Sequence, residues 1–135
     1  MDKFVLFAED DLIQAKVLSA VCKNLALPAS GFSIVSSGAE AIAYFKQAQS
    51  PETAVKKPDI VITDLKMPEV DGLDLLKWIR ESAEFKDTPV VILTGAFDPG
   101  IQKLAEALGC DGFFEKPAGL AKMGETIKKA LAVRS

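Results

Sequence analysis

The sequence predicts an α/β fold in which five parallel strands form a doubly wound sheet with the order 2-1-3-4-5. Two observations predict it. Short runs rich in Val, Ile and Phe recur five times along the 135 residues, and each precedes a segment whose apolar residues repeat with helical spacing. The runs are apolar on both faces, which is typical of parallel strands covered by helices on each side. Right-handed crossovers between five such βα units then favour this strand order.

The first two βα units occupy the N-terminal part of the chain. FVLFA at residues 4–8 predicts a strand, and the apolar positions 13, 17, 20, 21 and 25 share one face of a helix. FSIVS at residues 32–36 predicts the second strand, followed by helical positions 39, 42, 43 and 45. The polar segment 46–58 has no periodicity, and we predict a surface loop there without chemistry of its own.

The remaining three units follow without another long polar segment. DIVITD at residues 59–64 predicts the third strand and precedes helical positions 73, 76 and 79. VVILT at 90–94 predicts the fourth strand, with helical positions 101, 104, 105 and 108 after it. GFFE at 112–115 predicts the fifth strand, with helical positions 120, 123, 127 and 131.

Length and composition bound the class of protein. Residues 1–135 suit one compact domain, large enough to bury roughly 68% of its unfolded surface. The longest apolar runs are strand-sized, and the N-terminus lacks the pattern of a signal peptide, so we expect a cytoplasmic protein.

A net charge of −3 argues against a nucleic-acid-binding surface. Cys22 and Cys110 are too few and too far apart for a metal or disulfide pattern, and we interpret them as small buried hydrophobes.

The chain contains no histidine, which excludes several activities. Without an imidazole there is no Ser-His-Asp or Cys-His nucleophile pair and no histidine zinc site. Histidine kinase activity in this chain is excluded for the same reason.

Charged or hydroxyl side chains follow four of the five predicted strands. Glu9 and Asp10 follow the first strand, Asp64 ends the third, Thr94 ends the fourth and Lys116 follows the fifth. The carboxyl ends of parallel strands meet at one edge, and the first and third strands are neighbours at the topological switch point. Carboxylates about 4 Å apart repel by about 4 kcal/mol at an effective dielectric near 20, so the cluster requires counter-charge. Lys116 supplies one, and Mg²⁺, which prefers a few oxygen ligands, suits the remainder. This arrangement predicts that a phosphoryl group on Asp64 would be stabilised by Mg²⁺, Lys116 and the Thr94 hydroxyl.

Four motifs carry a family resemblance: FAEDD, ITDLKMPEVDG, VVILTGA and FFEKPA. In order and approximate spacing, they resemble the response-regulator receiver domain of two-component signalling, similar to the chemotaxis response regulator. The resemblance extends from Lys3 to about Val133, and it implies the flavodoxin-like receiver fold of five βα units.

The resemblance implies a role for each matching residue. Asp64 corresponds to the phosphoacceptor, which takes a phosphoryl group from a histidine kinase or a histidine phosphotransfer protein. Mg²⁺ is expected to bind Glu9, Asp10, Asp64 and the backbone carbonyl of Lys66. Thr94 and Lys116 are expected to contact the phosphoryl group, Phe113 to be the aromatic switch residue, and the Lys116–Pro117 bond to be cis.

The implied activity is a conformational switch rather than a classical enzyme, with at most self-catalysed phosphotransfer and autodephosphorylation. Its output face consists of the fourth helix, fifth strand and fifth helix, through which a downstream protein or a second copy is expected to bind. We expect no direct contact with nucleic acid and no membrane insertion. We expect no effector domain after Ser135. We therefore expect the output to be another protein, a dimer or a phosphate sink, unless the chain was cut from a larger one.

Structural interpretations compete with some of these roles. Asp11 is expected to cap the first helix. Taken without the other motifs, Asp64 could simply be a turn-forming residue before Asp71-Gly72, which supplies turn or capping chemistry. A phenylalanine on a strand, such as Phe113, is usually a core residue. We assign Trp78 and Tyr44 to packing.

The sequence also departs from common family usage at several positions. Lys66 and Ala96 each lie two residues after a key site residue, and we expect the charge of Lys66 to steer phosphodonors and alter the dephosphorylation rate. Ala118 replaces a large apolar residue, and Phe113 replaces the more frequent tyrosine.

Other classes of protein fit less well. A Mg²⁺-dependent phosphohydrolase would require a second acid where Lys66 stands, and a nucleotide-binding protein would require a G-x-x-x-x-G-K-[ST] loop that the sequence lacks. The alternative that remains open is a phosphorylation-independent interaction module with the receiver fold.

Overall fold

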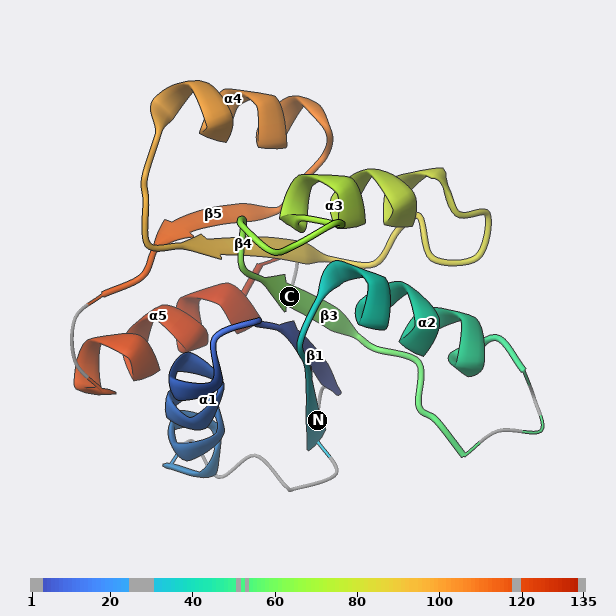
Figure 1. Cartoon of the computed structure of the whole chain (residues 1–135), viewed down its shortest axis with the longest axis horizontal. Helices are drawn as coiled ribbons and strands as arrows, with labels where there is room; N and C mark the ends of the chain where they lie inside the picture. Colours follow the sequence, from blue (N-terminus) through green and yellow to red (C-terminus); the bar gives the residue numbers. More distant parts are fainter. Residues whose placement is uncertain (1–3, 25–30, 51, 53, 118–119, 134–135) are drawn as a thin grey trace.

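The computed structural model of the chain describes residues 4–24, 31–50, 52, 54–117 and 120–133. Its five strands lie parallel in the order β2-β1-β3-β4-β5, which confirms the predicted topology (Figure 1). The strands are β1 (Val5–Ala8), β2 (Phe32–Val35), β3 (Ile60–Thr63), β4 (Val90–Thr94) and β5 (Gly112–Glu115). The helices are α1 (Leu12–Asn24), α2 (Gly38–Ala48), α3 (Gly72–Glu81), α4 (Pro99–Ala107) and α5 (Leu120–Leu131).

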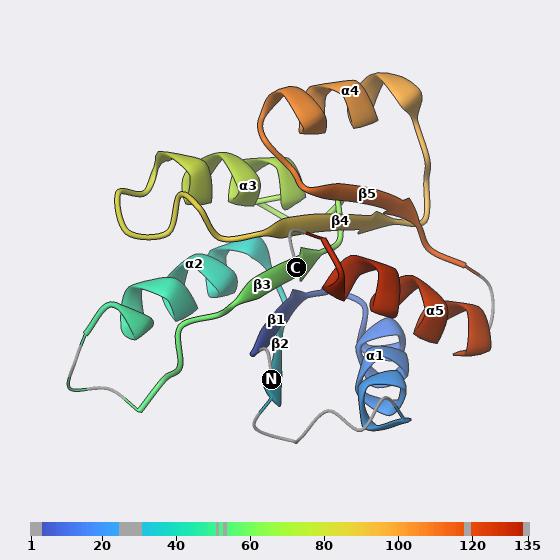
Figure 2. The ribbon, with the colours of Figure 1, turned by 180° about the vertical axis from the view of Figure 1, so that it is seen from behind.

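The helices cover both faces of the sheet, so the core has two layers. Helices α2, α3 and α4 lie on one face, and α1 and α5 lie on the other (Figures 1 and 2). Side chains alternate along each strand, so Leu6 of β1 packs in the first layer and Val5 and Phe7 pack in the second. All residues of β1, β3 and β4 are buried, as their continuous apolar sequence requires.

The helices begin where the sequence supplies capping residues. Asp11 accepts hydrogen bonds from the backbone N–H groups of Ile13 and Gln14 at the start of α1, which confirms its predicted capping role. Asp71 and Asp74 form a reciprocal capping box at the start of α3. Asp98 caps α4, whose first residue is Pro99.

The aromatic side chains assigned to packing lie in or beside the core. The rings of Trp78 and Phe45 have centroids 5.9 Å apart, and those of Phe45 and Phe85 are 4.7 Å apart. Tyr44 stacks on Phe4 with a centroid separation of 6.1 Å. These contacts join α2 to α3, to the chain that leads into β4 and to the residue before β1.

Some local expectations differ from the structure. The predicted loop 46–58 begins as helix, because α2 continues to Ala48 through residues that favour helix, and the sequence has no breaker before Pro51. The Lys116–Pro117 bond is not cis, since no cis bond occurs among the described residues. Trans is the isomer that X-Pro bonds favour by about 0.5–1 kcal/mol. Helical position 25 and Ala118 lie outside the described residues.

Within the described parts of the chain, no helix has both the length and the apolar character needed to cross a membrane.

Candidate functional site

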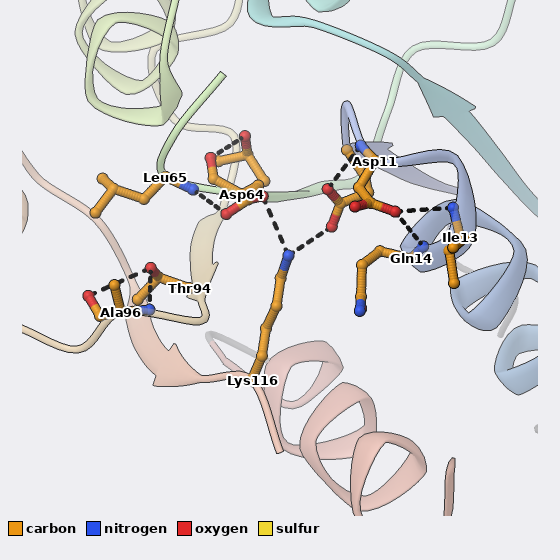
Figure 3. Close-up of polar contacts among 10 residues, drawn as sticks. Asp11, Ile13, Gln14, Asp64, Leu65, Thr94, Ala96 and Lys116 are labelled. Carbon is orange, nitrogen blue, oxygen red and sulfur yellow. Dashed lines mark hydrogen bonds and ion pairs between the residues drawn. The ribbon is translucent and has the colours of Figure 1, made fainter. Parts of the chain in front are cut away.

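The predicted site residues converge on a cleft of about 540 Å³ at the carboxyl edge of the sheet. Because the strands are parallel and in register, β1, β3, β4 and β5 each bring a lining residue to this edge, at the end of the strand or directly after it. The cleft is lined by Glu9, Asp10, Asp11, Gln14, Asp64, Lys66, Thr94, Gly95, Ala96 and Lys116. All the residues predicted to bind metal or the phosphoryl group therefore line it, whereas the predicted switch residue Phe113 does not. Figure 3 shows polar contacts of Asp64, Thr94 and Lys116.

Three carboxylates form the acidic part of the cleft. One oxygen from each of Glu9, Asp10 and Asp64 lies within 4.8 Å of the other two. Their exposure differs, since Glu9 is 3% exposed, Asp64 is half-buried and Asp10 is exposed. The Glu9 carboxylate also accepts a hydrogen bond of 3.2 Å from the backbone N–H of Asp11, which orients it toward the cleft. Burial and the nearby Asp64 charge raise the pKa of Glu9, although its hydrogen bond with Lys116 opposes this.

Lys116 joins two of these carboxylates from the opposite side of the cleft. Its ammonium nitrogen lies 2.6 Å from Glu9 Oε1 and 3.1 Å from Asp64 Oδ2 (Figure 3). Burial by itself lowers the pKa of Lys116, but the hydrogen bond to Glu9 and the charge of Asp64 outweigh it, so the net pKa is raised. The side chain therefore remains a cation that offsets part of the negative charge.

Asp64 is held in a defined orientation by its own backbone surroundings. Its Oδ1 accepts a hydrogen bond of 2.7 Å from the backbone N–H of Leu65, which leaves Oδ2 facing Lys116. The Thr63 hydroxyl donates to the Asp64 carbonyl oxygen at 2.9 Å. One carboxylate oxygen is thus fixed by the chain and the other is presented to the cleft.

Thr94 ends β4 beside this cluster and is buried. Its hydroxyl accepts a hydrogen bond of 3.1 Å from the backbone N–H of Ala96, which turns it toward the β4–α4 loop (Figure 3). Gly95 and Ala96 are exposed and line the cleft next to it. A group entering the cleft therefore meets a hydroxyl that already has a backbone partner.

Lys66 and Phe113 lie at the periphery of the site. Lys66 is exposed on the rim of the cleft, and a second groove of about 310 Å³ is shared by Lys66, Asp10 and Asp71. Phe113 is half-buried on β5, and its ring meets the exposed Phe97 ring edge to face at 6.0 Å. Phe113 packs against the core layer of α2, α3 and α4.

Two contributors to the cleft were missed from the sequence. Gln14 lines it from the first turn of α1, and the Leu65 amide fixes one oxygen of Asp64. Helical spacing after the capping residue Asp11 would have identified Gln14. No sequence signal would have identified a backbone amide.

The donor set fits a hard divalent cation. Three carboxylates face one ammonium group, so the cluster carries an excess of negative charge that Mg²⁺ would offset. Carboxylate oxygens in small number, in an open cleft with room for water, are the ligands that Mg²⁺ prefers.

Comparisons with known proteins agree in family and fold. The family model described as response regulator receiver domain matches residues 5–128. The polar-differentiation response regulator DivK of Brucella ovis is 28% identical over 133 residues, covering 97% of this chain and 98% of DivK. The phosphorylated cyanobacterial phytochrome response regulator RcpA shares the fold with a TM-score of 0.82 at 22% identity, covering 100% of this chain and 98% of that one. A response regulator in red light signaling of R. palustris has a TM-score of 0.82 at 25% identity, covering 94% of this chain and 90% of that one.

Proposed function

The chain belongs to the response regulator receiver domain family of two-component signalling, and from this premise we propose that Asp64 accepts a phosphoryl group in the presence of Mg²⁺. Receiver domains interact with histidine kinases and with downstream targets. The observation that carries the proposal is the convergence of Glu9, Asp10, Asp64 and Lys116 in one cleft. We further propose that residues 1–135 form a single receiver domain. A cytoplasmic location remains a prediction.

Phosphoryl transfer in this proposal is a displacement at phosphorus. The Asp64 Oδ2 atom attacks the phosphorus of a partner phosphohistidine, an O–P bond forms, and the N–P bond to the imidazole breaks. The imidazole nitrogen leaves with the electron pair of that bond and takes a proton from water. The hydrogen bond from the Leu65 amide to Oδ1 holds the carboxylate so that the other oxygen points into the cleft.

The surrounding residues would stabilise the charge on the transferring group. Glu9, Asp10 and Asp64, with the Lys66 carbonyl, would hold Mg²⁺, which would neutralise phosphoryl oxygens. Lys116 lies 3.1 Å from Asp64 Oδ2, close enough to bind an oxygen of a phosphoryl group whose phosphorus is bonded to that atom. The Thr94 hydroxyl supplies a further donor after it leaves Ala96.

Switching would follow from the added charge. A phosphoryl group adds roughly two negative charges and three acceptor oxygens. Thr94 would move toward it, the Ala96 contact would break, and Phe113 would repack inward from its contact with Phe97. The face of α4, β5 and α5 would change shape, and a downstream protein or a second copy would bind the new shape.

The test is intact-mass analysis after incubation with acetyl phosphate, with and without Mg²⁺. We expect one phosphoryl adduct on the wild type that requires Mg²⁺ and is lost in Asp64→Asn. Asp87→Asn is the matched control, since Asp87 is an exposed carboxylate before β4, at the opposite edge of the sheet. Its adduct should equal that of the wild type.

Beryllofluoride provides an independent readout of the same site. With Mg²⁺ present, it should shift the NMR signals of Thr94 and Lys116. Absence of both the adduct and these shifts would refute phosphorylation and favour a phosphorylation-independent interaction module.

A further inference from the structure

We infer that Gly38, the first residue of α2, is a positioning residue for the β3–α3 loop, residues 65–71. The inference rests on the proposed function, because this loop carries the Lys66 carbonyl proposed as a metal ligand. Gly38 lies on a different helix and does not line the cleft. Any effect of Gly38 on metal binding must therefore pass through the backbone of the loop.

The contact between α2 and the loop leaves no space for a side chain at Gly38. A Cβ atom on this buried residue would overlap the Val70 carbonyl oxygen and would lie 2.6 Å from Val70 Cγ1 and 3.0 Å from the Val70 carbonyl carbon. Two of these atoms belong to the backbone, so a side-chain rotation at Val70 cannot relieve the overlap. Any larger residue at position 38 must displace the loop itself.

The loop adopts a conformation that needs external support. The Val70 N–H donates to the Pro68 carbonyl at 2.7 Å, and the residue between them, Glu69, has φ of 65°. This is γ-turn geometry, with a non-glycine residue in the left-handed region. Such conformations persist when surrounding contacts determine them, and they cluster at functional sites. The Val70 carbonyl beside Gly38 belongs to the residue that closes this turn.

A second close contact fixes the loop at its other end. The Gly72 N–H donates to the Leu65 carbonyl at 2.7 Å. A Cβ on Gly72 would overlap the Asp64 carbonyl oxygen and lie 3.1 Å from Leu65 Cα. The loop is therefore held between the backbone of Asp64 and the N-terminal end of α2, and Lys66 lies between these two contacts in the sequence.

These contacts predict that Gly38→Ala moves the loop and weakens Mg²⁺ binding. Loss of a residue that supports a metal ligand typically lowers metal affinity by 10–100-fold, and we expect about 10-fold here because the carboxylate ligands remain. In the metal-free protein, the amide NMR signals of residues 65–71 should shift, whereas those of α5 should not.

The experiment is isothermal titration of the full chain with MgCl₂, for the wild type and three variants. Gly124→Ala is the chemically matched control, because a Cβ there meets only Val21 Cγ1 at 3.9 Å. Ile127→Val is the stability control, since it removes a buried methyl group from the core layer of α1 and α5. We expect both controls to bind Mg²⁺ as the wild type does and Gly38→Ala to bind about 10-fold more weakly.

Each outcome has a separate meaning. If the wild type binds Mg²⁺ and Gly38→Ala binds equally well, the inference on Gly38 is overturned and the proposed function stands. If the wild type does not bind Mg²⁺, the proposed metal site fails and the inference fails with it.

If Gly38→Ala does not fold, Gly38→Ala/Val70→Ala replaces it and Val70→Ala becomes its control, because the double variant removes the Cγ1 contact and keeps the carbonyl overlap. Equal affinity of those two variants would also overturn the inference.

Discussion

Replacement of Lys116 by methionine should strengthen Mg²⁺ binding although it removes a residue of the site. In the structure the Lys116 ammonium lies 2.6 Å from Glu9 and 3.1 Å from Asp64, both proposed metal ligands. A divalent cation that binds these oxygens must displace the ammonium or bind beside it. Methionine keeps most of the side-chain volume and removes the charge.

The size of the effect follows from Coulomb's law. Two unit charges about 4 Å apart interact by about 1 kcal/mol in bulk water, so an ammonium and a divalent ion repel by about 2 kcal/mol. Because Lys116 and Glu9 are mostly buried, the water value is a lower limit for this repulsion, and salt screening reduces that limit to about 1–2 kcal/mol. We therefore expect Lys116→Met to bind Mg²⁺ at least about 5-fold more tightly than the wild type.

The same substitution should destabilise the metal-free protein. Glu9 is 3% exposed and would lose its only described cationic partner beside the Asp64 carboxylate. Removal of one member of such a pair costs about 2–3 kcal/mol after allowance for the partial exposure of Lys116. Saturating Mg²⁺ should recover most of this loss.

Calorimetric titration with MgCl₂ and urea unfolding with and without Mg²⁺ test both parts. Lys122→Met, an exposed lysine on α5, is the control and should change neither quantity. If Lys116→Met bound Mg²⁺ no more tightly than the wild type, the competition between ammonium and metal would be refuted.

Three further predictions concern other parts of the chain. Arg80→Met should lower the free energy of unfolding in urea by about 2–4 kcal/mol, because the guanidinium binds the Thr88 carbonyl in the α3–β4 loop and the Gly109 carbonyl and Asp111 in the α4–β5 loop. A loss below about 0.5 kcal/mol, the usual range for surface substitutions, would contradict this. Burial raises the pKa of Cys22 to about 11. Its alkylation by iodoacetamide at pH 8 should therefore be at least about 100-fold slower in the folded than in the urea-unfolded protein, and equal rates would count against burial. Lys66→Ala should slow phosphorylation by acetyl phosphate several-fold at low salt and change the lifetime of the phosphoryl group. Lifetimes equal to the wild type would show that the Lys66 charge has no such effect.

The sequence by itself determined the strand order and which residues meet at the site. Continuous apolar strands require cover on both faces, and right-handed crossovers then leave few topologies. Glu9, Asp64, Thr94 and Lys116 each lie at or just after a strand end. Parallel strands bring these positions to one edge whatever the details of packing, so their convergence follows from spacing along the chain.

The tertiary structure alone decided the contacts made by the backbone. We predicted a loop from residue 46 onward, but α2 continues to Ala48 because residues 46–48 favour helix. The trans bond at Lys116–Pro117 could not be derived from the dipeptide, because the two isomers differ by only about 0.5–1 kcal/mol.

The Leu65 amide at Asp64 and the overlap that any side chain at Gly38 would make with the Val70 carbonyl also depend on the folded chain. Gly38 and Val70 are far apart in the sequence, and their contact arises because α2 and α3 lie side by side on one face of the sheet (Figure 1). Every residue except proline carries the same backbone N–H and carbonyl groups, so the sequence does not mark which of them will meet. The side chains that form the site could therefore be predicted from the sequence, whereas the contacts between backbone groups depend on how the folded chain packs.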